Sequence, residues 1–366
     1  MTAPKSLKER PEKRKVLTIA LVAAAVLLVI ALILYEHFYR GGGIGYAHGA
    51  GEAAVHFVDV GQGDCIVIQL PDGKNVLIDG GDTSSAVKNK VTGYIAALGI
   101  TRFDVVLLTH GDADHAGGLR AVLAMPNLRA ETIYMPYLRS TSDKDPLKDT
   151  AAVLLTTAVY RGFVEAVVGS GAAIRYTLAG GLPEAAGAEY RFIVYTPLNL
   201  AAYDINVGSA SDKNGVSPIM IPEYKGRRVM FTGDATQKTE AVFVDYAAVM
   251  GVQAEAAVDV LKVAHHGSAY STTQAFLDLV KPSYAVVSAG AGNAYGHPAP
   301  AALARLTAVA GFRALYRTDV HGDIVCVITE KARLLWYNSK EGAVTAALFS
   351  DGVKVLYIKQ RRECII

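Results

Sequence analysis

The stretch THGDADHAGG, residues 109–118, decides the fold of this chain. It closes an apolar run, residues 103–110, that predicts a buried strand ending in a loop. Four side chains that can bind a metal ion fall within six residues of that loop: His110, Asp112, Asp114 and His115. Buried together, the two carboxylates would repel each other unless a cation lay between them. A solvated polar turn is the alternative, and the ligand pattern favours a metal site.

Three further segments place metal-binding residue types directly after predicted strands. FTGDA carries Asp234, LKVAHHGS carries His265 and His266, and NAYGHP carries His297. A single histidine at a strand end is usually a packed or surface residue, but five of the nine histidines lie at such junctions. Because the loops at strand ends form sites at the edge of a sheet, these segments predict one shared site.

The pattern around these segments is rich in strands that alternate with helices, which predicts a layered α/β domain. Residues 125–215 give the least clear pattern, and Thr236 is the expected N-cap of the helix that follows it. The predicted strands are 54–60, 64–70, 75–79, 103–110, 190–195, 217–221, 228–231, 258–264, 284–288, 324–329 and 333–337. The predicted helices are 88–98, 116–124, 146–160, 236–250, 272–279 and 299–310.

The N-terminal region predicts a membrane anchor. Residues 16–35 contain no charge over twenty positions, the length that a helix needs to span the hydrocarbon core of a bilayer. The basic tail at 1–15 precedes them, so we expect a cytoplasmic N-terminus and an extracytoplasmic body. A cleaved secretory signal, which would release a secreted protein, is the alternative. We expect a flexible tether at 36–53, a main domain over 54–340 and a C-terminal β-hairpin extension over 341–366.

Composition excludes several classes of protein. The hydrophobic fraction of 51% excludes wholesale disorder, and three cysteines exclude a disulfide framework. Beyond residue 15 the chain holds 30 Lys and Arg against 32 Asp and Glu, so composition gives no support for tight nucleic-acid binding. Lys262 is expected to face solvent. The candidates for a local basic groove are Lys213, Lys225, Arg227 and Arg228.

Taken in order, these motifs resemble the metallo-β-lactamase fold, and most of all the C-terminal hydrolase domain of the ComEC/Rec2 DNA-uptake proteins. The resemblance covers about residues 54–328. It implies an αββα sandwich of the α/β class, here preceded by one N-terminal transmembrane helix. Full-length ComEC proteins carry a multi-span channel, which we do not expect this chain to form. The matching stretches are 57–81, 107–119, 231–235, 261–268, 281–290 and 293–298, with 316–324 matching more loosely.

The resemblance also implies roles for individual residues. Asp234 would be the carboxylate that bridges two metal ions. The implied metal ligands are His110, Asp112, Asp114, His115, Asp234 and His265 or His266, a choice that the sequence leaves open. The implied catalytic groups are Asp114, His266 and His297, and the implied substrate contacts are Asn214 and Ser217. Polar residues in two early turns are either structural or support the ligands from behind: Asp59, Gln62, Asp64, Asp79 and Asp82.

Two departures from the family pattern bear on the chemistry. No histidine lies between His115 and His265, so the first metal position would be rich in carboxylate, which shifts its preference from Zn²⁺ towards Mn²⁺. The family's GHPHP motif reads GHPAP here, with Ala299 in place of one proposed proton-handling histidine. We therefore expect one or two divalent ions, Zn²⁺ or Mn²⁺, as cofactors.

The expected function is that of a membrane-anchored, extracytoplasmic phosphodiesterase or nuclease that uses a metal-bound hydroxide. Through the resemblance, the expected partners are single-stranded or double-stranded DNA and the channel proteins of DNA uptake. Two alternatives stay open: an esterase for small or cell-wall phosphodiesters, and a non-catalytic DNA-capture subunit with a vestigial metal site. The sequence leaves the oligomeric state open.

Overall fold

The computed structural model describes residues 48–137, 157–187, 189–199 and 213–340, three helical positions at 26, 28 and 29, and the backbone of 345–346. Within these residues, no helix combines the length and the apolar character that a bilayer span requires. The predicted tail, nearly all of the predicted anchor, most of the tether and most of the C-terminal extension lie outside the described residues. Those boundaries therefore stay predictions.

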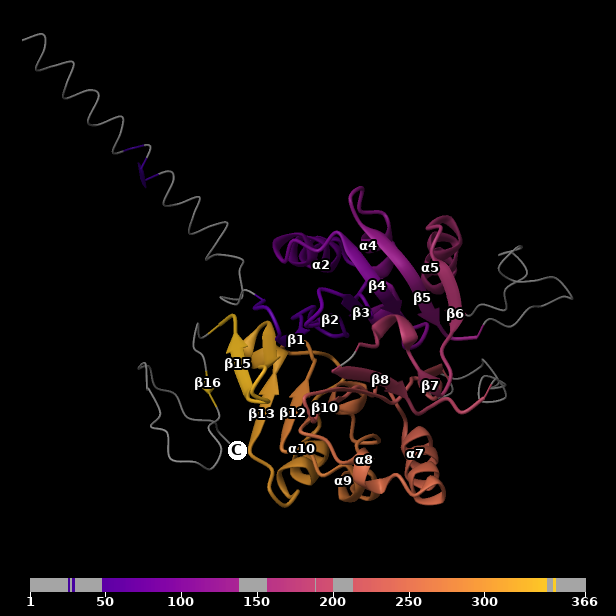
Figure 1. The fold of residues 1–366 in the computed structure, drawn as a ribbon, viewed down its shortest axis with the longest axis vertical. Coiled ribbons are helices and arrows are strands. Elements are labelled where there is room, and N and C mark those ends of the chain that lie inside the picture. The colour runs from indigo at the N-terminus through magenta and orange to yellow at the C-terminus, as the bar shows by residue number, and fades with distance from the viewer. Residues whose placement is uncertain are drawn as a thin grey trace, which may run out of the picture. The chain divides into compact units, whose positions relative to one another are not determined.

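Two β-sheets form the centre of the body (Figure 1). The nine-stranded sheet has the order β16 (Thr345–Ala346), β15 (Leu334–Asn338), β14 (Ile324–Ile328), β1 (Ala53–Phe57), β2 (Ile66–Gln69), β3 (Asn75–Ile78), β4 (Arg102–Leu107), β5 (Arg129–Met135) and β6 (Ala173–Tyr176). The seven-stranded sheet has the order β13 (Ala314–Arg317), β12 (Tyr284–Val287), β11 (Val260–Lys262), β10 (Arg227–Met230), β9 (Met220–Tyr224), β8 (Tyr190–Val194) and β7 (Gly180–Gly181).

Helices cover the outer face of each sheet (Figure 1). The first group, α2 (Ser85–Ala97), α4 (Leu119–Leu123) and α5 (Ala158–Gly169), packs on the nine-stranded sheet. The second group, α7 (Gln237–Met250), α9 (Gln274–Val280) and α10 (Pro300–Thr307), packs on the seven-stranded sheet. The predicted αββα sandwich is confirmed. The remaining short helices are α3 (Ala113–Ala116), η3 (Pro183–Ala185), α8 (Gln253–Ala256), η5 (Ala264–Gly267) and α11 (Thr318–His321).

Three apolar layers hold the four structural layers together, and strand β1 shows why the sequence produces them. Val55 and Phe57 point into the layer between the sheets, whereas Ala54 points into the layer beneath the first group of helices. Side chains alternate along a strand, so a strand buried on both faces must be apolar at nearly every position. The same double burial explains the long apolar run that leads to residue 110.

The site lies where parallel strands end. Strands β3 to β6 are mutually parallel, and so are β10 to β13, so the carboxyl ends of each set lie at one edge of their sheet. The loops that follow β3, β4, β10, β11 and β12 carry nearly all of the predicted site residues. Sheet topology therefore explains why motifs far apart in sequence meet.

The structure corrects several predicted elements. Strands β5, β6, β7 and β13 were not predicted, and β9 begins at Met220 rather than at residue 217. Strand β5 opens with exposed or half-buried Arg129, Ala130 and Glu131, which hides its apolar second half from a periodicity argument. Helix α5 extends to Gly169, well past the predicted end at 160, while residues 146–156 lie outside the described part of the chain.

Candidate metal centre

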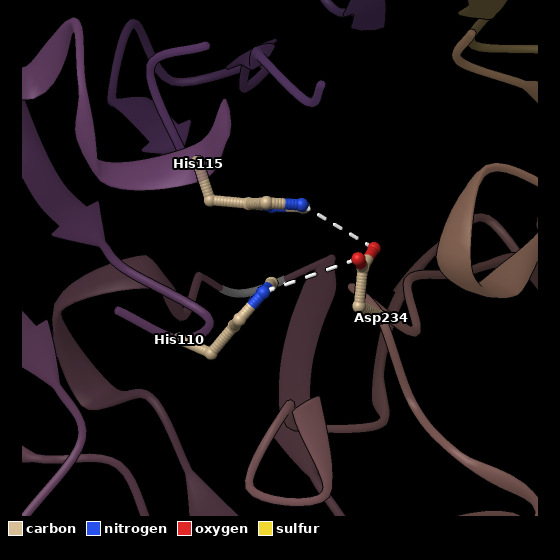
Figure 2. Close-up of side chains that lie close together, drawn as sticks. All are labelled: His110, His115 and Asp234. Atoms are coloured by element: carbon tan, nitrogen blue, oxygen red, sulfur yellow. Dashed lines mark ion pairs between the residues drawn. The ribbon is translucent and has the colours of Figure 1, made fainter. Parts of the chain in front are cut away.

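Figure 2 shows the centre of the site, where two histidines from the loop after β4 point toward a carboxylate that follows β10. His115 Nε2 lies 3.3 Å from Asp234 Oδ1, and His110 Nε2 lies 3.9 Å from Asp234 Oδ2. The close approach depends on Gly233, which has a φ of 48° and whose position leaves only 3.0 Å between an added Cβ and Thr109 Cβ. A glycine before Asp234 therefore lets the two sheets meet at their edges.

Four of the predicted ligands form a tight group. His266 Nε2 lies 3.3 Å from Asp114 Oδ2, 3.4 Å from Asp234 Oδ1 and 3.4 Å from His115 Nε2. Three different loops thus deliver two imidazole nitrogens and two carboxylate oxygens to one point. A combination of two histidines and two carboxylates suits a divalent transition metal ion.

The outer nitrogens of both histidines are occupied in a way that leaves the inner nitrogens available. His266 Nδ1 donates to the carbonyl oxygen of Ser288 at 2.9 Å, since that oxygen can only accept. His115 Nδ1 donates to Asp79 Oδ2 at 2.7 Å. In the neutral form of each ring, Nε2 therefore turns its lone pair toward the group, which is the arrangement found behind histidine ligands in metal proteins.

Asp79 supports a candidate ligand. The sequence left open whether Asp79 has a structural role in a turn or holds the ligands from behind. Besides His115, its carboxylate accepts from the backbone N–H of Thr109 at 2.8 Å and from the Thr109 hydroxyl at 2.7 Å. It is fully buried at the end of β3, one strand away from the ligand loop. Asp79 therefore fixes both the loop and the orientation of a ligand.

A second, looser group lies on the other oxygen of Asp234. His110 Nε2 is 3.8 Å from Asp112 Oδ2, and His265 Nε2 is 3.6 Å from Asp234 Oδ2. Lys213 Nζ approaches Asp112 Oδ1 at 3.8 Å. The geometry thus places His266 in the tight group and His265 on the opposite side of Asp234, a distinction that the sequence left open.

The residues present fit a metal ion. His110 Nε2 and Asp234 Oδ1 are buried and form no well-aligned hydrogen bond, although the Nε2 atoms of His115 and His266 lie 3.3 and 3.4 Å from Asp234 Oδ1. Groups of three potential ligands, with donor atoms within 4.8 Å of one another, include His110 with His115 and Asp234, and Asp114 with His115 and His266. A cation at these positions would satisfy the orphaned atoms.

The pKa shifts of His266 and Asp234 show that the tight group of ligands stabilises positive charge. Burial opposes protonation of His266, but the nearby carboxylates of Asp234 and Asp114 outweigh it and raise the pKa of His266 to about 9. Burial also disfavours the ionised form of Asp234, yet His266 and His115 hold the pKa of that carboxyl well below its usual range. A divalent cation would replace these protons.

Burial and the neighbouring His115 lower the pKa of His110 to about 3, which keeps that ring neutral and ready to bind a metal.

The structure contradicts the expectation that Lys262 faces solvent. Its side chain is fully buried, its ammonium pairs with the buried carboxylate of Asp64, and it donates to the carbonyl oxygen of Gly233 at 3.3 Å. Strand β11 lies in the interior of its sheet, between β10 and β12. A sequence signal was available, because Lys262 interrupts an apolar strand directly before the two histidines.

Asn214, Ser217 and His297 occupy different depths of the site. Ser217 is fully buried, accepts from the backbone N–H of Asp234 at 3.1 Å and lies 3.4 Å from His110 Nδ1, which favours a supporting role. Asn214 Nδ2 lies 3.3 Å from His265 Nε2. His297 is half-buried, with its ring 5.6 Å from that of His265 and 6.3 Å from that of His266. The predicted roles of all three residues in binding or catalysis stay predictions.

Three of the four basic-groove candidates do not reach the site. Arg227 pairs with Asp259 at 2.7 Å and Arg228 with Glu223 at 2.8 Å, while Lys225 pairs with Glu189. All three lie at the start of β10, whereas Asp234 follows its end. The expectation of a basic groove from these residues is therefore wrong, and Lys213 is the one candidate of the four beside the ligands.

Comparisons with known proteins agree with this geometry. Residues 58–132 and 216–291 match the sequence model of the Metallo-beta-lactamase superfamily. ComE operon protein 3 of Bacillus subtilis (strain 168) is 28% identical over 288 residues, which cover 75% of this chain and 33% of that protein. Competence protein ComA of Neisseria gonorrhoeae is 28% identical over 274 residues, which cover 75% of this chain and 32% of that protein. Recombination protein 2 of Haemophilus influenzae is 27% identical over 261 residues, 69% of this chain and 26% of that protein. The chain spans about a third or less of the length of these relatives.

Proposed function

The chain contains a domain of the metallo-β-lactamase superfamily, whose members are generally metal-dependent hydrolases, and on this premise we propose that it is a phosphodiesterase acting as a nuclease. One observation carries the proposal. Side-chain atoms of Asp114, His115, His266 and Asp234 converge from three loops through contacts of 3.3–3.4 Å, and the neighbouring His110 Nε2 is buried without a hydrogen-bond partner. Such a group is costly to fold unless a cation binds to it.

The residues of the site would form two sets of metal ligands. Asp114, His115, His266 and Asp234 Oδ1 would hold one ion, and His110, Asp112 and Asp234 Oδ2 would hold a second. When bound, such ions lower the pKa of water and neutralise the charge of a phosphodiester. The side chain of Asp114 is 31% exposed, so it would orient the attacking water from the solvent side. His297, half-buried with an unpartnered Nδ1, would contact the leaving oxygen. Burial and the nearby rings of His265 and His266 lower the pKa of His297, so the neutral ring would donate a hydrogen bond to that oxygen.

The choice of nucleic acid as substrate, and of the membrane as location, rests on relatives and on sequence. Two relatives are named competence proteins or products of a com operon, and one is named a recombination protein. The uncharged stretch at 16–35 supports a single-pass anchor with the hydrolase domain outside the cytoplasm. We propose that the enzyme acts in DNA uptake at the cell surface.

The test uses the full chain in mild detergent with Mn²⁺ or Zn²⁺. We expect cleavage of a labelled single-stranded oligonucleotide, and a loss of at least about 100-fold in Asp114→Ala. Asp278→Ala, at an exposed carboxylate on helix α9, is the matched control and should cleave like the wild type.

Other outcomes point to the alternatives. Turnover of a chromogenic phosphodiester with the oligonucleotide left intact would indicate an esterase for small phosphodiesters and contradict the nuclease proposal. A protein that takes up neither metal by elemental analysis after dialysis would contradict the hydrolase proposal altogether and leave a DNA-capture subunit.

A further inference from the structure

Tyr295 is an exposed aromatic residue attached to the wall of the metal centre. Its side chain is 72% exposed, and its ring stacks on that of His297 with centroids 5.7 Å apart and planes inclined by 23°. His297 in turn contacts the rings of His265 and His266. Exposed aromatic residues are common, so exposure alone carries no argument. The stacking on a ring that reaches the candidate ligands is what connects Tyr295 to the site.

The loop that carries Tyr295 is held in one conformation. The side-chain oxygen of Asn293 accepts from the backbone N–H groups of Tyr295 at 3.1 Å and of His297 at 3.0 Å. Its amide nitrogen donates to the carbonyl oxygens of Gly290 at 2.8 Å and of His297 at 2.5 Å. Gly290 N–H donates to Gln62 Oε1 at 3.2 Å, which ties the loop to the turn between β1 and β2. The exposed ring of Tyr295 is therefore carried by a loop whose backbone is fixed by hydrogen bonds.

The same loop is joined to the loop of the two histidines. Ala299 N–H donates to the carbonyl oxygen of Gly267 at 2.8 Å, and an added Cβ on Gly267 would lie 2.5 Å from Pro298 Cβ. The position of Tyr295 relative to the ligands is consequently fixed by contacts on both sides of His297. A ring fixed in this way can bind a flat group without losing much conformational entropy.

We propose that Tyr295 is a specificity residue that stacks on a nucleobase next to the phosphodiester held at the metal centre, a proposal that rests on the function proposed above. Base–aromatic stacking supports binding of single strands of any sequence, since every base has a flat face. Stacking also offers a source of affinity for DNA other than positive charge. Three of the four residues expected to form a basic groove lie away from the site and pair with acidic residues. Stacking would supply affinity that Lys225, Arg227 and Arg228 do not.

The test measures binding before cleavage, by rapid mixing of the full chain loaded with Mn²⁺ with two fluorescent strands: an oligo(dT) and the same strand with every base removed. Tyr295→Ala should weaken binding of oligo(dT) by about 5- to 150-fold, the range for one lost base–aromatic stack. It should change binding of the abasic strand by less than about twofold, because phosphate contacts are untouched. Tyr295→Phe keeps the ring and is the matched control, expected to bind both strands like the wild type.

The outcomes separate this proposal from the hydrolase proposal. Equal losses on both strands in Tyr295→Ala, or no loss on either, would overturn the stacking role. A wild-type protein that hydrolyses a chromogenic phosphodiester but binds both strands equally would also overturn it, while leaving metal-dependent hydrolysis intact. A base-dependent loss in a protein without nuclease activity would support stacking and contradict the nuclease.

Discussion

The ammonium of Lys262 and the carboxylate of Asp64 form a fully buried ion pair directly behind the candidate ligands. Asp64 Oδ1 lies 3.7 Å from His266 Nδ1, and Asp64 Oδ2 lies 3.9 Å from His115 Nδ1. The pair thus joins the turn before β2 to strand β11 and lies beside two ligands at once. It places an ammonium group beside several buried carboxylates, where their net negative charge would otherwise be hard to bury.

The first prediction concerns this ion pair. Lys262→Met should lower the free energy of unfolding by about 3–5 kcal/mol, since it leaves the Asp64 carboxylate buried without a counter-charge. Urea denaturation followed by circular dichroism measures the loss. Lys238→Met, at an exposed lysine on helix α7, should stay within about 0.5 kcal/mol of the wild type. The double variant Lys262→Met/Asp64→Asn should recover part of the loss, and a single variant as stable as the wild type would refute the argument.

The second prediction tests the support that Asp79 gives to His115. Asp79→Asn leaves one acceptor oxygen for the two sides on which Asp79 accepts, Thr109 N–H and His115 Nδ1, so one of these donors faces an amide NH2. The support of the His115 ring is then disturbed, and metal affinity should fall about 10- to 100-fold. Competition with a coloured chelator measures the affinity. Asp104→Asn changes another buried carboxylate on the same sheet, on strand β4, which accepts from Asn75 N–H at the start of β3. This variant should leave the affinity within twofold. Equal losses in the two variants would contradict the assigned role.

The third prediction concerns pH. The pKa of His266 is about 9 in the metal-free fold and 6.5 in the unfolded chain, so its protonation stabilises the fold below about pH 6.5. This stabilisation is lost as the pH rises through 9. The free energy of unfolding of the metal-free protein should therefore fall by up to about 3 kcal/mol between pH 6.5 and 9.5. His266→Gln should flatten this dependence, and so should saturation with metal, because the ring is then already deprotonated. A metal-free protein that gains stability over this range would contradict the sign.

The fourth prediction concerns Gly63 in the turn between β1 and β2. It has a φ of 138°, and an added Cβ would lie 2.3 Å from the carbonyl oxygen of Asp114. Gly63→Ala should therefore displace the ligand loop and weaken metal binding as well as stability. Gly73→Ala is the matched control, because Gly73 also has a positive φ of 82° but open space around an added Cβ. It should cost about 1–2 kcal/mol of stability, the strain of a non-glycine residue at positive φ, and leave metal affinity unchanged.

Local sequence was sufficient for most of the strands and for the choice of candidate ligands. The strands β2, β3, β4 and β12 fall where runs of apolar residues predict them, because a strand buried on both faces needs such a run. Thr236 caps helix α7 by accepting from Thr239 N–H, as its position before the helix predicts. Strand β5 was missed because its first residues are polar and partly exposed, and such a segment carries no clear period.

The sequence by itself determined that His110, Asp112, Asp114 and His115 share one loop and that Asp234 and a histidine pair follow other strands. Only the tertiary structure decided that His266 rather than His265 joins the tight group, that Asp79 supports His115, and that Lys262 is buried against Asp64. The physical reason is that local periodicity encodes which residues form a strand and which follow it. Contacts between charges depend instead on which strands are neighbours and on how closely their ends approach, and these are set by packing across the whole sandwich.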